Sequence, residues 1–435
     1  MNIEELYQKK WNNEDLDSEE IFQFVQYLLS EDVDRAICKK FISLFSELSN
    51  RDMVNFVSAI CKSGKKMPLK HSGELVDKSS IGGINDVVSL ITLPLLASLG
   101  FYVAKINFAD DDEISSLDRL HLIDGLQTQL SKRKIDRIMD ESHMCFFEVP
   151  QDMMPAYKVL RELLKEAKMA DNIYFKTIFL VCKKVMLGVQ TLALDIKCGE
   201  GCVFATMVDA ENYAEMVRAV CKEFDIAVIT NIVYITEPLM KKMGLRLELE
   251  AAINMLSNRI KYKSSPFFTN CKNIVSSILM YTKKCNSKQE ANKMISTAME
   301  SGLVLEKFMQ MVMAQGGDLK YFDTPDELIN NTNCVNIFAE SAGYMQDVDV
   351  VTVKKVIDVL GGGKDENGKI KDDFVGIEIL VSEGDKVKKN QLIAKVYFAL
   401  SNAKFAKGIK LIKDALIISR KKPNNAKRKR KYANV

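Results

Sequence analysis

The sequence predicts a mixed α/β protein in three parts: a helical part built from two separated segments, a large α/β part with a central sheet, and a C-terminal β-rich portion. Apolar residues recur at helical spacing before residue 65 and again over 152–190. A strand, a loop of small residues, a helix and a second strand follow one another between 73 and 106. Short strands separated by glycine turns begin near residue 345.

The expected domain division follows these changes of pattern along the 435 residues. It consists of a helical domain (1–70 with 152–190), an α/β domain (71–151 with 191–340), a C-terminal β-rich portion (341–422) and a basic tail (423–435).

The helical domain shows a start signal and apolar stripes. Residues 17–20 (DSEE) place an N-cap residue and acidic residues ahead of a stripe that begins at Ile21. Further stripes cover 41–48 and 53–60, and Gly64 ends the last of them. This pattern predicts a compact group of amphipathic helices.

The α/β domain is predicted from alternating strands and helices. We expect strands at 73–78, 101–106, 191–197 and 226–230, and helices at 86–99 and 210–224. In the C-terminal portion we expect strands at 375–381 and 392–398, a flexible loop at 361–372 and a closing helix at 402–419.

Composition excludes several classes of protein. The apolar fraction of 47% and the charged fraction of 27% are those of a soluble globular protein. No stretch approaches the roughly 20 uncharged apolar residues of a membrane helix, and the N-terminus lacks a signal peptide, so we expect a cytoplasmic protein, with a nuclear location as the alternative. The ten cysteines form no CxxC pair and only three histidines occur, so neither a metal site nor disulfides are expected.

The charge is unevenly distributed, although the net charge is only +3. Basic residues run from Arg420 through Lys431 near the C-terminus. Such a run contacts phosphate backbones, acts as an import signal, or is simply solvated. One hypothesis is therefore that this tail binds an RNA-rich or acidic partner.

The loop over residues 78–83 (KSSIGG) is the strongest chemical candidate. It lies between an expected strand and the N-terminus of an expected helix, where free backbone N–H groups attract anions. Lys78 and Ser80 would complete a phosphate cradle, and Ser89 lies further along the same helix. The alternative is an ordinary strand-to-helix turn, because the loop matches neither the Walker nor the Rossmann pattern.

Residues 76–90 (VDKSSIGGINDVVSL) resemble the VDKHSTGGVGDxxSL signature of thymidine and pyrimidine-nucleoside phosphorylases. Further segments are similar in order and spacing: 155–156, 194–201 (LDIKCGEG), 237–239, 244–248, 361–363, 375–377 and 384–387. The resemblance covers about residues 1–422. It implies the fold of the type II nucleoside phosphorylases, with the three parts described above.

The resemblance also implies a reaction, the reversible phosphorolysis of a pyrimidine nucleoside to the free base and a pentose 1-phosphate. Inorganic phosphate would be the co-substrate, and no other cofactor is implied. Family members are usually homodimers, formed through the helical domain. The positions that correspond to family phosphate-binding residues are Lys78, Ser80, Ser89 and Ser116.

The chain departs from the family on the phosphate side. A family glycine-rich stretch is replaced by the acidic residues Asp110–Glu113, although Leu117–Leu120 (LDRL) is kept. Four acidic residues near a phosphate would repel it.

The base side departs further. The family arginine and serine that bind the pyrimidine correspond to Leu164 and Phe179, and the histidine of the first loop corresponds to Ser79. Only the family lysine is retained, as Lys183. No residue has a firm catalytic assignment, but Arg161 lies one helical turn before Leu164 and would replace the missing guanidinium.

Three hypotheses follow. The first is an inactive phosphorylase scaffold that binds a ligand or partner, because the base donors are lost. The second is an active pentosyltransferase with altered specificity, which would use Lys183 and Arg161 for the base. The third is a nucleotide or sugar-phosphate sensor that keeps domain closure without catalysis.

Overall fold

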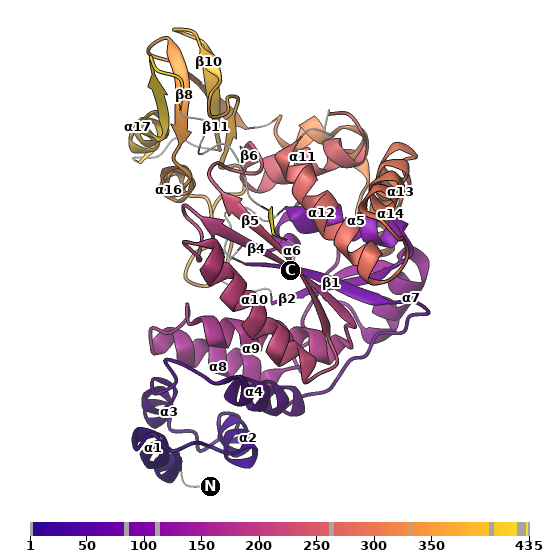
Figure 1. Ribbon diagram of the computed structural model, residues 1–435, viewed down its shortest axis with the longest axis vertical. Helices are drawn as coiled ribbons and strands as arrows, with labels where there is room; N and C mark the ends of the chain where they lie inside the picture. The colour runs from indigo at the N-terminus through magenta and orange to yellow at the C-terminus, as the bar shows by residue number, and fades with distance from the viewer. Residues whose placement is uncertain are drawn as a thin grey trace.

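The computed structural model describes residues 3–81, 87–108, 114–260, 265–330, 332–399 and 404–423, and the backbone of 432–433. Figure 1 shows the N-terminal helices at one end of the long axis, a twisted central sheet in the middle and the C-terminal strands at the other end. This arrangement confirms the expected mixed α/β fold with a two-segment helical part. The exact domain boundaries stay a prediction.

Six helices make the helical part. They are α1 (Ile3–Trp11), α2 (Ser18–Tyr27), α3 (Arg35–Ile42), α4 (Asn50–Lys62), α8 (Pro155–Glu166) and α9 (Ile173–Leu187). Asp17 caps α2 in a capping box with Glu20, as the sequence indicated. The stripes of α4 and α9 meet, so two segments that are distant in sequence share one core.

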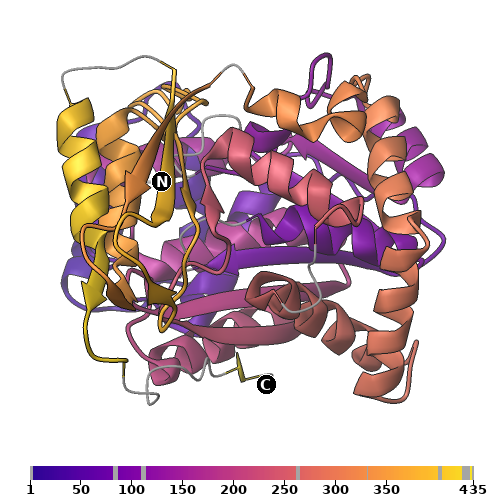
Figure 2. The ribbon, with the colours of Figure 1, turned by 90° about the horizontal axis from the view of Figure 1, so that it is seen from above.

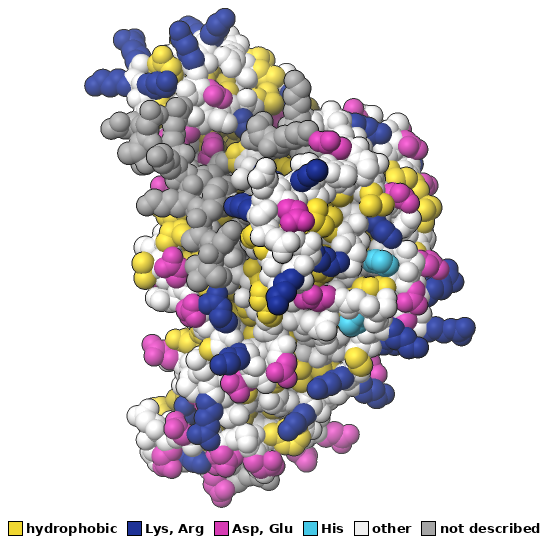
Figure 3. Space-filling model, turned by 45° about the vertical axis from the view of Figure 1, so that its right-hand side comes forward, with side chains coloured by type: hydrophobic (Ala, Val, Ile, Leu, Met, Phe, Trp, Pro, Cys, Tyr) yellow, Lys and Arg dark blue, Asp and Glu magenta, His cyan; other side chains and the backbone are white. Residues whose placement is uncertain are grey.

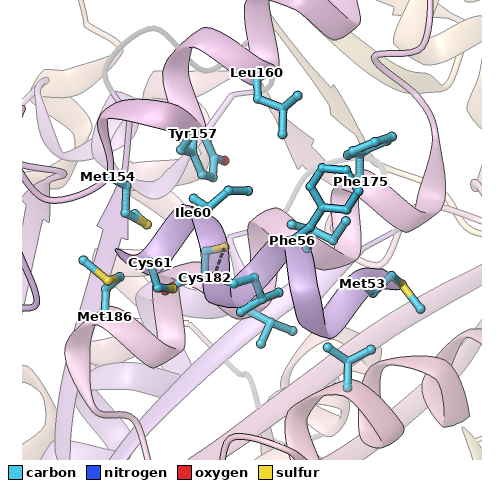
Figure 4. Packing of buried hydrophobic residues seen from close by; sticks show 14 of the residues in the cluster. Met53, Phe56, Ile60, Cys61, Met154, Tyr157, Leu160, Phe175, Cys182 and Met186 are labelled. Carbon is cyan, nitrogen blue, oxygen red and sulfur yellow. Dashed lines mark hydrogen bonds between the residues drawn. The ribbon is translucent and has the colours of Figure 1, made fainter. Parts of the chain in front are cut away.

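Aromatic rings join these helices in the core. Phe56 of α4 is fully buried and meets Phe45 and Phe175 edge to face, at centroid distances of 5.4 and 5.6 Å. Figure 4 shows Phe56 pointing toward Phe175 of α9, with Cys61 and Cys182 close together between the same two helices. Edge-to-face contacts of this kind stabilise a core beyond the area that they bury.

The central sheet has six strands in the order β13-β5-β4-β1-β2-β3. They are β1 (Leu75–Ile81), β2 (Tyr102–Asn107), β3 (Met144–Glu148), β4 (Thr191–Gly199), β5 (Ala227–Ile235) and β13 (Tyr432–Ala433). The first five run parallel, and β13 pairs antiparallel with the outer strand β5. Residues 432–433 thus lie at the edge of this sheet.

Helices cover both faces of the sheet, as parallel strands require. The helical part and α10 (Met207–Lys222) pack on the face that carries Leu192 and Leu194, whereas Ala193 points to the opposite face. The helices on that second face are α5 (Val88–Ser98), α6 (Ser116–Leu120), α11 (Leu245–Leu256), α12 (Pro266–Tyr281), α13 (Lys288–Glu300), α14 (Leu303–Ala314), α15 (Lys320–Asp323) and the 3₁₀ turn η1 (Pro325–Leu328). The buried side chains of α7 (Lys132–Ser142) belong to the core of the first face. None of the described helices has the length and apolar character needed to cross a membrane.

The C-terminal part has a core of its own. One sheet has the order β6-β9-β11-β7 and another the order β10-β8-β12. Their elements are β6 (Lys242–Met243), β7 (Asn333–Phe338), β8 (Gly343–Val348), α16 (Val350–Leu360), β9 (Gly376–Ile379), β10 (Lys386–Val387), β11 (Leu392–Phe398), α17 (Phe405–Ala415) and β12 (Leu416–Ser419). Figure 2 shows these strands and the yellow helix α17 to one side of the helices of 245–314.

One expectation about this part is corrected. The closing helix ends at Ala415, and residues 416–419 form strand β12 instead, because this run with two β-branched isoleucines pairs with β8. The segment 361–372, expected to be a flexible loop, belongs to no helix or strand and contains a turn closed by a bridge between Lys364 and Ile370. Lys364 is also buried in an ion pair with Asp118 of α6, 2.9 Å apart.

The aromatic core of the helical part predicts the effect of truncating one ring. We expect Phe56→Ala to lower the free energy of unfolding by about 3–5 kcal/mol, because it removes a buried ring and leaves a cavity. Trp11→Ala is the matched control, since Trp11 is 61% exposed, and should cost less than about 1 kcal/mol. Urea unfolding measures both, and equal losses would contradict the packing described.

Candidate functional site

The strand order predicts a ligand site at the carboxyl ends of β1 and β4. From β1 the chain builds outward through β2 and β3 on one side, and then through β4 and β5 on the other. In open parallel sheets ligands bind outside the strand ends where the order reverses in this way. The expectation of a loop over 78–83 is wrong for its first half, because residues 78–81 continue strand β1 and pair with β4. Ser80 and Ile81 end β1 at this point, and Gly82 and Gly83 lie outside the described residues.

A buried polar cluster occupies this position. Lys78 and Ser80 of β1 share the sheet face that packs on α5 and α12, and Asp195 and Lys197 of β4 lie beside them in register. The Asp195 carboxylate lies 3.4 Å from Lys78 Nζ and accepts hydrogen bonds from Lys197 Nζ at 2.6 Å and Ser80 Oγ at 3.2 Å. Lys78 Nζ also donates to Ser80 Oγ.

Two asparagines hold the other oxygen of this carboxylate. Asn231, the neighbour of Asp195 on β5, donates to Asp195 Oδ1 at 3.1 Å and to Asn270 Oδ1 of α12 at 2.7 Å. Asn270 Nδ2 lies 3.4 Å from the same Oδ1. The cluster therefore spans three strands and one helix. Two lysines and a hydroxyl held together in this way can bind a phosphate-like anion.

A second charged cluster lies on the opposite face of β1. Asp77, the residue before Lys78, pairs with Lys184 of α9, and its Oδ1 lies 3.6 Å from Lys105 Nζ. The pairing of β1 with β2 stops at Val76, and beyond it Lys105 Nζ donates to the Lys78 carbonyl at 2.5 Å. This cluster joins the strand that carries Lys78 to the helical part.

Two ammonium groups share one carboxylate in this second cluster, and the pKa values shift accordingly. Burial alone would raise the pKa of Asp77, but Lys105 and Lys184 hold that pKa below its usual range. Burial lowers the pKa of Lys184 to about 8, because Asp77 offsets the desolvation only in part and Lys105 adds repulsion.

Aromatic rings surround the residues that were expected on the base side. Phe108, just after β2, stacks on Tyr157 of α8 with centroids 4.2 Å apart, and Tyr157 meets Phe179 of α9 at 4.3 Å. The guanidinium of Arg161 lies 5.8 Å from the Phe108 ring centroid, and Lys183 Nζ lies 5.6 Å from both the Phe108 and Tyr157 centroids. The two expected base-side cations therefore meet at one aromatic stack.

The remaining expected residues are dispersed. Leu164 is buried in the core of the helical part, and Ser79 is buried on β1. Ser89 is the second residue of α5 and Ser116 the first residue of α6, and both are buried. The acidic stretch Asp110–Glu113 lies outside the described residues. Among the residues that are described, no group of three or more His, Cys, Asp or Glu side chains could hold a metal ion.

The sequence reasoning did not assign several residues that the structure places in these clusters. They are Asp77, Lys105, Lys184, Asp195, Lys197, Asn231 and Asn270. A signal was present for two of them, because Asp195 and Lys197 alternate with Leu194 and Ile196 in an otherwise apolar strand. Charged residues inside a buried parallel strand seldom persist without partners. The partner on α12 had no local signal.

Known proteins are similar to nearly the whole chain. A pyrimidine-nucleoside phosphorylase of Staphylococcus haemolyticus is 25% identical over 401 residues, which cover 91% of this chain and 92% of that protein. A thymidine phosphorylase of Mycoplasma genitalium is 25% identical over 401 residues, covering 91% and 95%. No protein-family model matches the chain.

Solved structures share the fold at lower identity. Anthranilate phosphoribosyltransferase from Thermus thermophilus superposes with a TM-score of 0.55 at 13% identity, covering 71% of this chain and 99% of that structure. The Saccharomyces cerevisiae enzyme in complex with 4-fluoroanthranilate gives 0.53 at 10% identity, covering 72% and 98%. At these identities the likeness concerns the fold alone.

The pKa of Lys184 predicts a pH-dependent stability. Between pH 8 and 10.5 the unfolded chain keeps the Lys184 proton and the folded chain releases it, so the free energy of unfolding rises with pH. From pH 7.5 to 9.5 we expect the native protein to gain about 2 kcal/mol relative to Lys184→Met. Urea unfolding across this range measures the gain, with Lys65→Met as the exposed control. A pH-independent difference between native protein and Lys184→Met would contradict the assignment.

Proposed function

We propose that this chain, a divergent homologue of the thymidine and pyrimidine-nucleoside phosphorylases, binds a phosphate-like anion at Lys78 and Ser80 but does not carry out nucleoside phosphorolysis. It would act as a scaffold or binding protein. Inorganic phosphate or a phosphorylated ligand would be the anion, and a homodimer formed through the helical part is part of the proposal.

The packing of the base side carries this proposal. Leu164 and Phe179 stand where the resemblance places the two groups that would bind a pyrimidine. Leu164 is 1% exposed in an apolar core, and Phe179 packs on Tyr157. Neither side chain can donate a hydrogen bond to a departing base. Each lost donor of this kind costs about 3–4 kcal/mol of transition-state stabilisation.

The anion side supports ligand binding. Lys78 and Ser80 lie together at the switch point of the sheet, on the carboxylate of Asp195. An ammonium group and a hydroxyl at the end of a parallel strand favour a phosphoryl oxygen. A binding protein derived from an enzyme is expected to keep the anion-binding residues and to lose the base-binding residues.

Phosphorolysis by the purified protein tests the proposal. Thymidine, deoxyuridine, uridine and cytidine are each incubated with phosphate, and free base is quantified by chromatography. We expect no release above the rate without protein. Release of base that Lys78→Ala abolishes would contradict the proposal.

Anion binding is tested separately by thermal unfolding. We expect phosphate to raise the Tm of the native protein and of Lys65→Ala, an exposed control, because a ligand that binds only the folded state stabilises it. The Tm of Lys78→Ala should not respond. An equal rise of Tm with phosphate in Lys65→Ala and Lys78→Ala would mean that the anion binds away from Lys78.

A second candidate function is an active pentosyltransferase. Arg161 and Lys183 favour it, because both cations lie against Phe108 and would supply donors in place of the lost pair. In this case turnover would be detected, and Lys183→Ala and Arg161→Ala would each lower kcat/KM by about a hundredfold or more. Turnover that neither substitution affects would remove this candidate.

A further inference from the structure

The sheet of strands β10, β8 and β12 has one core face and one open face. Met345 and Val348 of β8 are buried in the core of the C-terminal part. Tyr344, the neighbour of Met345, points the other way and is partly exposed. This open face belongs to neither charged cluster of the candidate site.

Tyr344 lies between two strands that each lead into basic residues. It pairs with Lys386 of β10 on one side and with Ser419 of β12 on the other. Side chains directly opposite each other on neighbouring strands share a face, so Lys386, Tyr344 and Ser419 form one row across the sheet. Arg420 and Lys421 continue directly from Ser419.

Basic residues outnumber acidic ones around this row, although Asp385 directly precedes Lys386 and Asp347 lies on β8. We call the basic face the row of Lys386, Tyr344 and Ser419 with its exposed neighbours Lys388, Lys389, Arg420, Lys421 and Lys422. Residues 386–422 contain a single acidic residue, Asp414. Figure 3 shows Lys and Arg side chains gathered at this end of the molecule, whereas Asp and Glu gather at the end formed by the N-terminal helices.

We propose that the basic face binds a single-stranded nucleic acid. Adjacent strands are about 5 Å apart, so Lys386 and Ser419 flank Tyr344 at about 5 Å on either side, and Arg420 follows Ser419 directly beyond the end of β12. A polynucleotide laid across the sheet would place phosphates at these basic side chains and stack an unpaired base on the tyrosine ring. Aromatic platforms inside basic grooves bind single strands in this way.

The tyrosine favours a nucleic acid over an acidic protein surface. Charge alone would equally suit the acidic end of a second copy, where Glu4, Glu5, Glu14 and Asp34 are exposed. An acidic helix surface gains nothing specific from an aromatic ring at the centre of the basic face. A single-stranded nucleic acid uses both features.

Fluorescence anisotropy with labelled oligouridylate at 50 and 200 mM salt tests the proposal. We expect binding that weakens with salt, as phosphate contacts require. Tyr344→Ala should weaken it about tenfold while Tyr344→Phe keeps it, because stacking needs only the ring. Lys386→Glu combined with Arg420→Glu should weaken it more than tenfold and reduce the salt dependence. Arg137→Glu, a charge reversal at an exposed site outside the basic face, should bind as the native protein does.

Several results would overturn the proposal. Binding that the basic-face variants leave unchanged, but that deletion of residues 424–435 abolishes, would assign the contact to the tail alone. A preference for duplex over single-stranded RNA and DNA of the same sequence would exclude base stacking. Self-association is measured by sedimentation velocity at low salt. If the protein associates with itself, does not bind RNA, and loses the self-association when Lys386→Glu and Arg420→Glu are combined, the partner of the basic face is a second copy of the chain.

Discussion

The carboxylate of Asp195 is the interaction on which the candidate site depends. One oxygen meets Lys78, Lys197 and Ser80, and the other meets Asn231 and Asn270. These partners come from β1, β4, β5 and α12, so a single buried charge fixes the positions of four elements. Removing one partner of such a buried pair leaves an uncompensated charge that costs about 3–5 kcal/mol. The geometry of Lys78 and Ser80 therefore follows from the whole sheet and not from the loop after β1.

Strand β1 transmits this constraint to the helical part. Lys78 belongs to the Asp195 cluster, and its neighbour Asp77 pairs with Lys184 of α9 through the opposite face. The residue before Lys184 is Lys183, which lies at the aromatic stack of Phe108 and Tyr157. The buried pair of Asp77 with Lys184 therefore connects the strand that carries Lys78 to the helix that carries Lys183.

Much of the architecture was predictable from the sequence, because local pattern determines it. The amphipathic stripes predicted the helices, and the strand predicted over 392–398 has the same bounds as β11. Helix 402–419 was wrong at its end, since the strand character of 416–419 depends on a partner, β8, far away in sequence. Lys78 and Ser80 were predicted as candidates, although as part of a loop and not of strand β1, where they lie. Asn270 was not predicted, because its contacts with Asn231 and Asp195 join residues that are far apart in sequence. Phe108 was not predicted either, because it stacks on Tyr157 of α8, which is distant in sequence.

The most direct test of this account is a crystal structure of the protein grown or soaked in phosphate. The account predicts an anion within about 3 Å of Lys78 Nζ and Ser80 Oγ. The rings of Phe108, Tyr157 and Phe179 should remain in contact beside it. An unoccupied cluster at saturating phosphate, or an open pocket in place of the aromatic stack, would contradict the claim that this fold keeps its anion side and has closed its base side.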